Sequence, residues 1–245
     1  MVTVHTAARR MPAVAARTTL DDSGLRFAIT IGADARPGQP LELALVWIGA
    51  DGYYGEQTIT ITPGEPELLF ADDAEHGPGN WLSTGGWGLV PVTGSSGKAY
   101  ADSPQGPYRP RSDNALVMRR PVNLAAFTAA HLEYRERFSV EPWADPCRIE
   151  ATANGHDWIT LATLAGGAQS EFRSRRINLD AFAGQEAVRL RFRLTANDIN
   201  QKDGWTIDDI RIWGYAKSAS FSEALPARPG TPSVPETDAA TVQSE

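Results

Sequence analysis

The chain has 245 residues, a formal net charge of -7 and a single cysteine, Cys147. One cysteine excludes an internal disulfide, and no run of residues is apolar enough to span a membrane. Its arginines gather at 109–120 and 173–176, but strand alternation would spread each group over two faces. Without one basic face we expect no nucleic-acid partner.

The N-terminal quarter contains few patterned segments. Residues 1–20 are rich in Ala, Arg and Thr and lack the apolar stretch of a signal peptide, so we expect a loose entry and no signal peptide. Residues 21–66 hold three alternating runs separated by Pro and Gly, at 25–31, 41–48 and 57–62. These runs predict a small antiparallel sheet. Because so few strands bury little surface, we expect this sheet to pack on the strands C-terminal to it.

From residue 67 to 216 many short strands recur between turns. The expected strands lie at 116–118, 130–138, 147–152, 158–161, 173–178, 188–194 and 206–213. In the run 188–194, apolar residues alternate with arginines, as in a half-buried antiparallel strand. Residues 180–184 form at most one helical turn. The chain is therefore predicted to be all-β, with a jelly-roll-like antiparallel β-sandwich over 67–216. Residues 217–245, rich in Pro, Ser and Thr, are predicted to be a disordered tail.

Several short motifs recur in a fixed order along this segment. They are LFADDAE at 69–75, Trp81, GWG at 86–88, GKAYADS at 97–103, SDN at 112–114, IEATANG at 149–155, Trp158, FAG at 182–184 and DGWTIDDI at 203–210. In this order they resemble the MAM-like, immune-inhibitor-A-type β-sandwich of secreted bacterial peptidases. The resemblance implies a secreted, non-catalytic accessory domain with a structural calcium. The parent enzyme would be a metallopeptidase, a carboxypeptidase or a subtilisin-like peptidase. Residues 21–66 resemble the small immunoglobulin-like (Ig-like) segment that precedes such sandwiches.

Acidic residues at strand ends predict a calcium site. Asp is poorly suited to strand interiors, and calcium takes six to eight oxygen ligands, including carboxylates. The predicted ligands are Asp72, Asp73, Glu75, Asp208 and Asp209, with Asp102 as a further ligand, and which member of each adjacent Asp pair binds the ion stays open. They would meet if the first and last strands of the sandwich are neighbours, and alternation with Ile210 and Ile212 would turn Asp208 inward. Two alternatives stay open: solvated acids at strand ends, and acids that accept hydrogen bonds from the backbone, Tyr and Trp.

Aromatic residues near loops predict a sugar-binding platform, because aromatic faces bury the apolar faces of pyranose rings. The predicted ligand-binding residues are Trp143, Tyr108, Tyr53 and Tyr54. Trp143, between Pro142 and Ala144 in an acidic loop, is the best candidate for exposure. Trp213 also lies near a strand end, whereas Trp81, Trp87, Trp158 and Trp205 are expected in the core.

No motif of a known hydrolase is present. The four histidines lack the His-Glu-x-x-His spacing, and there is no Gly-x-Ser-x-Gly elbow. A glycosidase would need two carboxylates in one cleft, and the sequence does not select a pair among Glu133, Glu136, Glu141, Asp145 and Glu150. We therefore predict a monomeric, calcium-stabilised, non-catalytic module of an exported enzyme that stabilises this parent or binds a glycan or protein. The alternatives are a carboxylate-based hydrolase and an adhesive or structural module for protein contacts.

Overall fold

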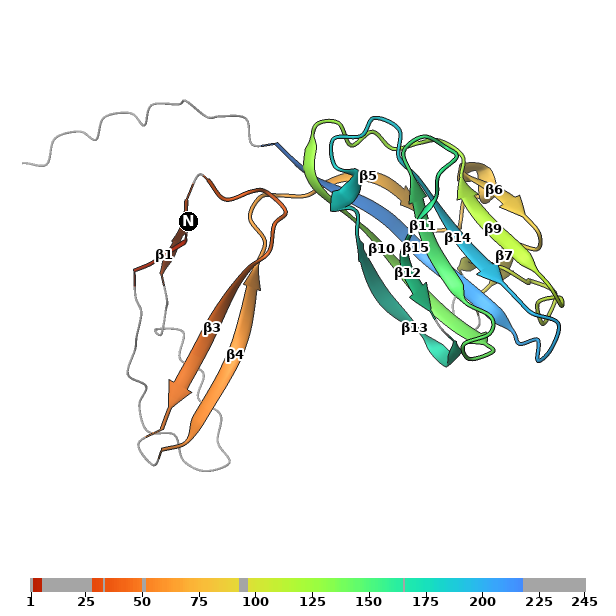
Figure 1. Ribbon diagram of the computed structural model, residues 1–245, viewed down its shortest axis with the longest axis horizontal. Helices are drawn as coiled ribbons and strands as arrows, with labels where there is room; N and C mark the ends of the chain where they lie inside the picture. The colour runs from red at the N-terminus through yellow and green to blue at the C-terminus, as the bar shows by residue number, and fades with distance from the viewer. Residues whose placement is uncertain are drawn as a thin grey trace, which may run out of the picture.

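A computed structural model describes residues 2–5, 28–32, 34–49, 52–92, 97–164 and 166–217. It shows an antiparallel β-sandwich of jelly-roll type, preceded by two small antiparallel sheets (Figure 1). The predicted tail at 217–245 falls outside the described residues except for Lys217, as does most of the segment 1–20. Among the described residues, no helix is long and apolar enough to cross a membrane.

The first sheet of the sandwich has six strands. Its order is β13 (Gly167–Asn178), β10 (Phe127–Val140), β15 (Gly204–Ala216), β8 (Lys98–Ala101) and β7 (Gly88–Pro91), and β5 (Glu67–Asp72) also pairs with β15. Ile210 lies opposite Asp72, so the first and last strands of the sandwich are neighbours, as predicted. β15 is paired on both sides and holds the sheet together.

The second sheet has five strands. Its order is β12 (Ile159–Leu164), β11 (Cys147–Thr152), β14 (Arg189–Thr195), β9 (Asp113–Met118) and β6 (Trp81–Thr84). Two short 3-10 helices complete the sandwich, η1 (Pro78–Asn80) and η2 (Asp180–Phe182). The second of these is the single helical turn expected at 180–184.

Aromatic side chains fill the space between the two sheets. Trp205 is fully buried and packs edge-on against Trp87, Tyr134 and Phe192 at centroid distances of 6.0, 6.5 and 5.5 Å. Trp81 joins the cluster through Phe192 at 5.9 Å. Such rings bury large apolar areas and contribute much of the energy of a core. The predicted burial of Trp81, Trp87 and Trp205 is confirmed.

The prediction that Trp158 lies in the core was wrong. It lies half-buried on the outer face of the second sheet, with the Arg191 guanidinium 4.3 Å from its ring centre. Alternation along β14 turns the arginines outward, and there Arg191 pairs with Glu150 at 2.6 Å. Trp158 therefore covers a charged surface rather than filling the interior.

β15 contains a bulge that sequence alternation does not anticipate. Asp209 has a φ of 51°, and the register with β10 shifts between Glu133 and Arg135. The extra residue lets Ile207 and Ile210, three positions apart, both reach the core. Asp208 and Asp209 are consequently only half-buried, and the expected inward orientation of Asp208 is corrected.

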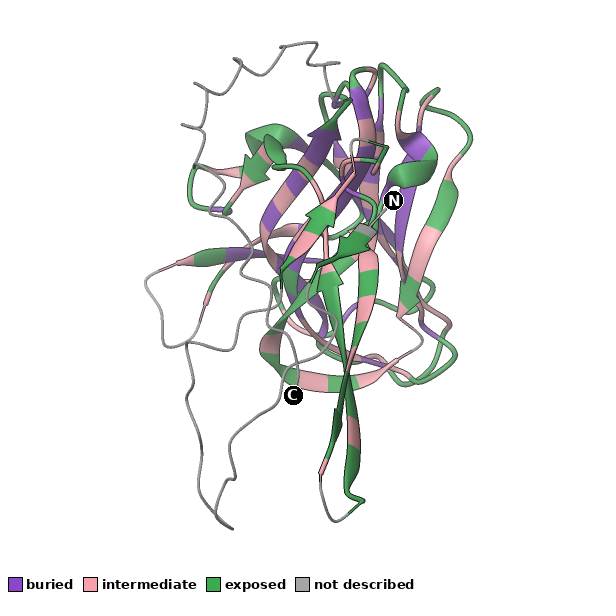
Figure 2. Cartoon of the chain, turned by 90° about the vertical axis from the view of Figure 1, so that its left-hand side faces the viewer, coloured by how far each residue is buried: buried purple, intermediate pink, exposed green. Residues whose placement is uncertain are grey.

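The N-terminal strands form two separate pairs rather than one sheet. β3 (Leu41–Ile48) pairs with β4 (Tyr54–Ile61), whereas β2 (Ile29–Ile31) pairs with β1 (Val2–Val4). The predicted joint sheet is therefore corrected, and Val2–Val4 form a strand inside the segment expected to be loose. The β3–β4 hairpin projects from the sandwich and is exposed on most of its surface (Figures 1 and 2).

Candidate functional site

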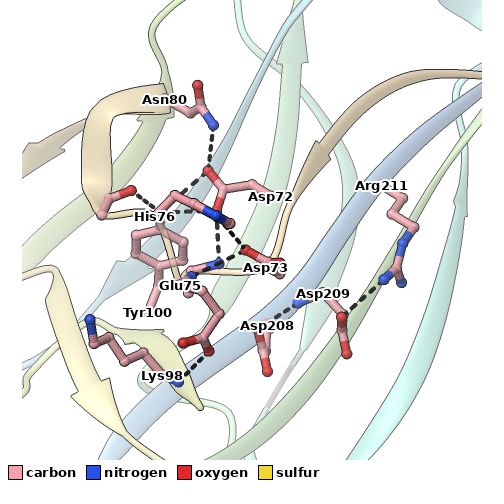
Figure 3. Close-up of polar contacts among 12 residues, drawn as sticks. Asp72, Asp73, Glu75, His76, Asn80, Lys98, Tyr100, Asp208, Asp209 and Arg211 are labelled. Carbon is pink, nitrogen blue, oxygen red and sulfur yellow. Dashed lines mark hydrogen bonds and ion pairs between the residues drawn. The ribbon is translucent and has the colours of Figure 1, made fainter.

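Asp72, at the end of β5, accepts hydrogen bonds at both carboxylate oxygens (Figure 3). Its Oδ2 accepts from Asn80 Nδ2 at 2.7 Å and from Trp81 Nε1 at 3.0 Å. Its Oδ1 accepts from the Ala74 amide at 2.9 Å and from the Tyr100 hydroxyl at 3.1 Å. Burial and the Asp72 charge hold the pKa of Tyr100 well above its usual range. Asp72 thus takes the alternative role of a hydrogen-bonded acid.

The turn after β5 presents two further acids towards β15. Ala74 has a φ of 63°, and Asp73 Oδ1 accepts from the Glu75 amide at 3.2 Å. Glu75 Oε1 in turn accepts from the Lys98 amide at 2.6 Å. Burial, with the neighbouring charges of Asp209 and Glu75, raises the pKa of Asp208 to about 6.

The other two predicted calcium ligands lie elsewhere. Asp209 forms ion pairs with Arg211 at 3.0 Å and with Arg135 at 3.3 Å. Asp102 is fully buried and accepts from the Trp205 amide at 2.6 Å, at the opposite end of β8 from the Glu75 contact. Neither carboxylate joins the turn at Asp73, so Asp102 and Asp209 are not brought together with the other predicted ligands.

The fit of calcium to these residues is limited. In the part of the chain that the structure describes, no group of three or more His, Cys, Asp or Glu side chains is arranged to hold a metal ion. A cavity of about 400 Å³ does lie beside the turn, lined by Asp72, Asp73, His76, Asn80 and Arg211 among others. The side chains of Asp73 and Glu75 are exposed, so rotation towards Asp208 is not blocked by packing.

Trp143 is the most exposed aromatic of the predicted platform. Its relative exposure is 86%, and its φ of 65° is unusual for a bulky residue. It lies in the connection between β10 and β11, which contacts the start of β13. There a Cβ on Gly166 would lie 2.4 Å from Pro142 Cα. The backbone therefore holds the indole in solvent at a cost of local strain.

Polar contacts fix the turn that carries Trp143. The Asp145 carboxylate accepts from the Tyr108 hydroxyl at 2.7 Å and from the Asn197 amide at 2.7 Å. The Glu141 amide donates to the same Tyr108 hydroxyl at 3.1 Å. The Glu141 carboxylate accepts from Asn197 Nδ2 at 2.9 Å and also from Asn200 Nδ2. The turn is thus anchored on both sides of Trp143.

Tyr108 is therefore a support rather than a surface aromatic. Only 2% of it is exposed, which corrects its prediction as a ligand-binding residue. Its apolar ring fills the core while its hydroxyl reaches the turn, a use of Tyr that sequence spacing does not reveal. Trp213 is half-buried on the outer face of the first sheet, where its Nε1 donates to Glu133 Oε2 at 3.1 Å.

Tyr53 and Tyr54 lie at the tip of the β3–β4 hairpin. They are 65% and 58% exposed, and Tyr54 donates from its hydroxyl to Glu56 at 2.9 Å. Their exposure agrees with the predicted platform. They belong to a different part of the chain from Trp143, so the predicted aromatics do not form one platform.

Three of the candidate catalytic carboxylates form hydrogen bonds or ion pairs at buried positions. Glu136 pairs with Arg175 at 3.0 Å and accepts from Trp205 Nε1 at 2.9 Å. Glu150 pairs with Arg191 on the second sheet, and Asp145 supports the Trp143 turn. Burial raises the pKa of Glu136. These contacts favour structural roles over a shared cleft.

No model of a known protein family matches the sequence, and comparison with curated proteins finds no relative. Solved structures do show similar β-sandwiches. A carbohydrate-binding module from Cellvibrio mixtus lichenase, in complex with cellotriose, is 17% identical with a TM-score of 0.38, over 62% of this chain and 100% of that one.

Two further structures show the same degree of likeness. A xylan-binding domain from Paenibacillus barcinonensis is 11% identical with a TM-score of 0.40, over 64% of this chain and 100% of that one. An exo-β-agarase is 13% identical with a TM-score of 0.43, over 62% of this chain and 25% of that one. At these values the likeness concerns the fold alone.

Proposed function

We propose that this chain is a non-catalytic module that binds a glycan through Trp143. The observation that carries the proposal is a bulky aromatic at 86% exposure on a strained backbone, held by the Tyr108, Asp145 and Glu141 contacts. A fixed indole loses little conformational entropy when a ligand stacks on it. Its apolar face suits the C–H face of a pyranose ring.

The test is binding of neutral soluble polysaccharides, such as xylan, mixed-linkage glucan and galactan, measured by affinity electrophoresis and calorimetry. Trp143→Ala is expected to weaken binding at least about tenfold, equivalent to about 1.4 kcal/mol. Tyr108→Phe, which leaves the indole in place and loosens its turn, is expected to cause a smaller loss. Tyr54→Ala removes another exposed aromatic, 58% exposed, in a different part of the chain and is the matched control.

The outcomes separate this proposal from a second candidate, a module for protein contacts. The hairpin favours this second function, because Ile48, Tyr53 and Tyr54 expose large apolar surfaces beside strand edges that no other described strand pairs with. Glycan binding that is lost in Tyr54→Ala and kept in Trp143→Ala would move the site to the hairpin. Absence of binding to every polysaccharide would refute the glycan proposal.

We also propose the finer assignment to the MAM-like, immune-inhibitor-A-type sandwich, as a secreted accessory module of a bacterial peptidase. In this proposal calcium binds near Asp73, Glu75 and Asp208 and stabilises the turn against β15. The interacting charges of Glu75 and Asp208 support it, because a cation would relieve their repulsion. The ordered motifs at 69–75 and 203–210 support the family.

Thermal unfolding with calcium and with EDTA tests the metal. An ion that binds only the native state stabilises it by about 2.7 kcal/mol at 100 times its Kd. We expect calcium to raise Tm in the natural chain and in Asp209→Ala, whose carboxylate is engaged by arginines. The rise should vanish in Asp73→Ala and Asp208→Asn. An unchanged Tm in a preparation shown to be metal-free would refute the calcium site.

A further inference from the structure

The outer face of the first sheet, turned away from the second sheet, carries a cluster of arginines from three strands. Arg135 and Arg137 lie two positions apart on β10 and therefore share a face. Arg211 of β15 lies opposite Glu133 of β10, and Arg176 of β13 lies opposite the same residue. Four arginines thus face three acids, Glu133, Asp208 and Asp209, on a chain whose net charge is -7.

Phe172 of β13 holds two of these arginines in place. The guanidinium carbons of Arg135 and Arg137 lie 5.2 and 5.3 Å from the centre of its ring. Contact with an aromatic ring orients a guanidinium without neutralising it. Within the described residues, Arg137 makes no ion pair, whereas Arg135 and Arg211 both pair with Asp209 and Arg135 lies opposite Asp208. The cluster therefore retains unneutralised donors that are fixed before any ligand arrives.

The strand that carries Arg135 and Arg137 leads directly to the proposed glycan anchor. After Arg137, β10 continues for three residues to its end at Val140, and the chain then enters the turn that presents Trp143. At a rise of about 3.3 Å per residue, the strand portion spans only about 10 Å. A polymer that stacks on Trp143 and extends along the outer face of β10 would meet both guanidiniums.

We propose that the arginine cluster selects anionic polysaccharides, whose carboxylate or sulfate groups it binds while Trp143 holds a sugar ring. This inference rests on the proposed glycan-binding function and further specifies that the glycan is anionic. The planar fork of Arg matches carboxylate and sulfate oxygens. The cluster's excess positive charge is complementary to a regularly charged polymer.

The test compares charged polymers with neutral forms of the same backbone. The probes are polygalacturonate against its methyl ester, and a sulfated galactan against its desulfated form, each titrated into the full chain. We expect at least one charged polymer to bind about tenfold more tightly than its neutral form at low salt. Arg135→Gln combined with Arg137→Gln should remove this preference. Arg189→Gln, on β14 of the second sheet, is the matched control and should keep it.

Each outcome has a separate meaning. Loss of neutral and charged binding in Trp143→Ala, with loss of only the charge preference in the arginine variant, supports both proposals. Equal binding of charged and neutral forms, still abolished by Trp143→Ala, overturns the arginine site and leaves the proposed function standing. Charge-dependent binding that is unchanged in Trp143→Ala refutes the Trp143 anchor instead. Equally tight binding of a single-stranded DNA of similar charge would overturn selection for polysaccharide.

Discussion

Asp102 is a buried carboxylate with one oxygen that finds no partner among the described residues. Its Oδ1 accepts from the Trp205 amide, whereas its Oδ2 is buried and unpaired. Burial raises the pKa of Asp102 to about 6, against the lowering effects of the hydrogen bonds from Trp205 and Ser103. The charged form is therefore disfavoured in the folded state.

This shift makes stability depend on pH in a defined direction. Because the folded pKa lies above the unfolded value, the contribution of Asp102 is fully present below about pH 3.8 and is lost as pH rises through about 6. Two pKa units correspond to about 3 kcal/mol. Asp102→Asn, which stays neutral and keeps the acceptor for Trp205, should therefore be more stable than the natural chain at pH 7 and similar at pH 4.

Urea unfolding at pH 4, 5, 6 and 7 measures the effect as a difference between the two chains. Glu136 and Asp208 also have raised pKa values, so part of the pH dependence should persist in Asp102→Asn. Asp102→Ala serves as a second variant, because it removes the acceptor for Trp205 as well as the charge. A constant difference between the natural chain and Asp102→Asn across this range would contradict the prediction.

At the scale of elements, the β3–β4 hairpin is joined to the sandwich through a tight glycine contact. Gly38 has a φ of 80°, and a Cβ there would lie 2.5 Å from Ala129 Cβ and 2.6 Å from Tyr215 Cδ2. The Thr128 hydroxyl donates to the Pro37 carbonyl at 3.2 Å. The connection before β3 therefore packs directly on β10 and β15.

Gly38→Ala is expected to lower the free energy of unfolding by more than the cost of backbone strain alone. Gly52 in the hairpin has a similar φ of 83°, but a Cβ added there would meet nothing within 4 Å, so Gly52→Ala is the matched control. Both variants carry the left-handed strain of about 1–2 kcal/mol. Overpacking should add about 1–3 kcal/mol in Gly38→Ala alone. Urea unfolding and proteolysis near residue 38 measure the difference, and equal effects would show that the junction is loose.

Local patterning predicted most strands but not how they bend or pair. The bounds 41–48 and 147–152 match β3 and β11, because alternation over these runs is unbroken. The bulge at Asp209 and the β1–β2 pairing were missed, because both depend on partners distant in sequence. Tyr108 was misplaced for the same reason, since its partner Asp145 lies on another segment. The arginine cluster could not be predicted from the sequence because its members come from different strands, whose pairing the sequence does not give.

At the scale of the whole molecule, β15 joins segments from the length of the sandwich. It pairs with β10 on one side and with β8 and β5 on the other. Ile207 is fully buried and lies between Glu136 of β10 and Tyr100 of β8. Non-local pairing of this kind delays folding until distant segments meet. The first sheet cannot close until the last strand is in place.

Ile207→Pro should therefore unfold the sandwich as a unit. Proline removes a ladder hydrogen bond and is excluded from central strands, and loss of packing brings the expected cost to about 3–5 kcal/mol. Ile159→Pro is the matched control. It changes the same residue type at the first position of β12, an edge strand, where Ile159 is 56% exposed. Near-UV circular dichroism and thermal unfolding should show a cooperative loss for Ile207→Pro and a small shift for Ile159→Pro. Equal shifts would mean that β15 is no more central to stability than the edge of the second sheet.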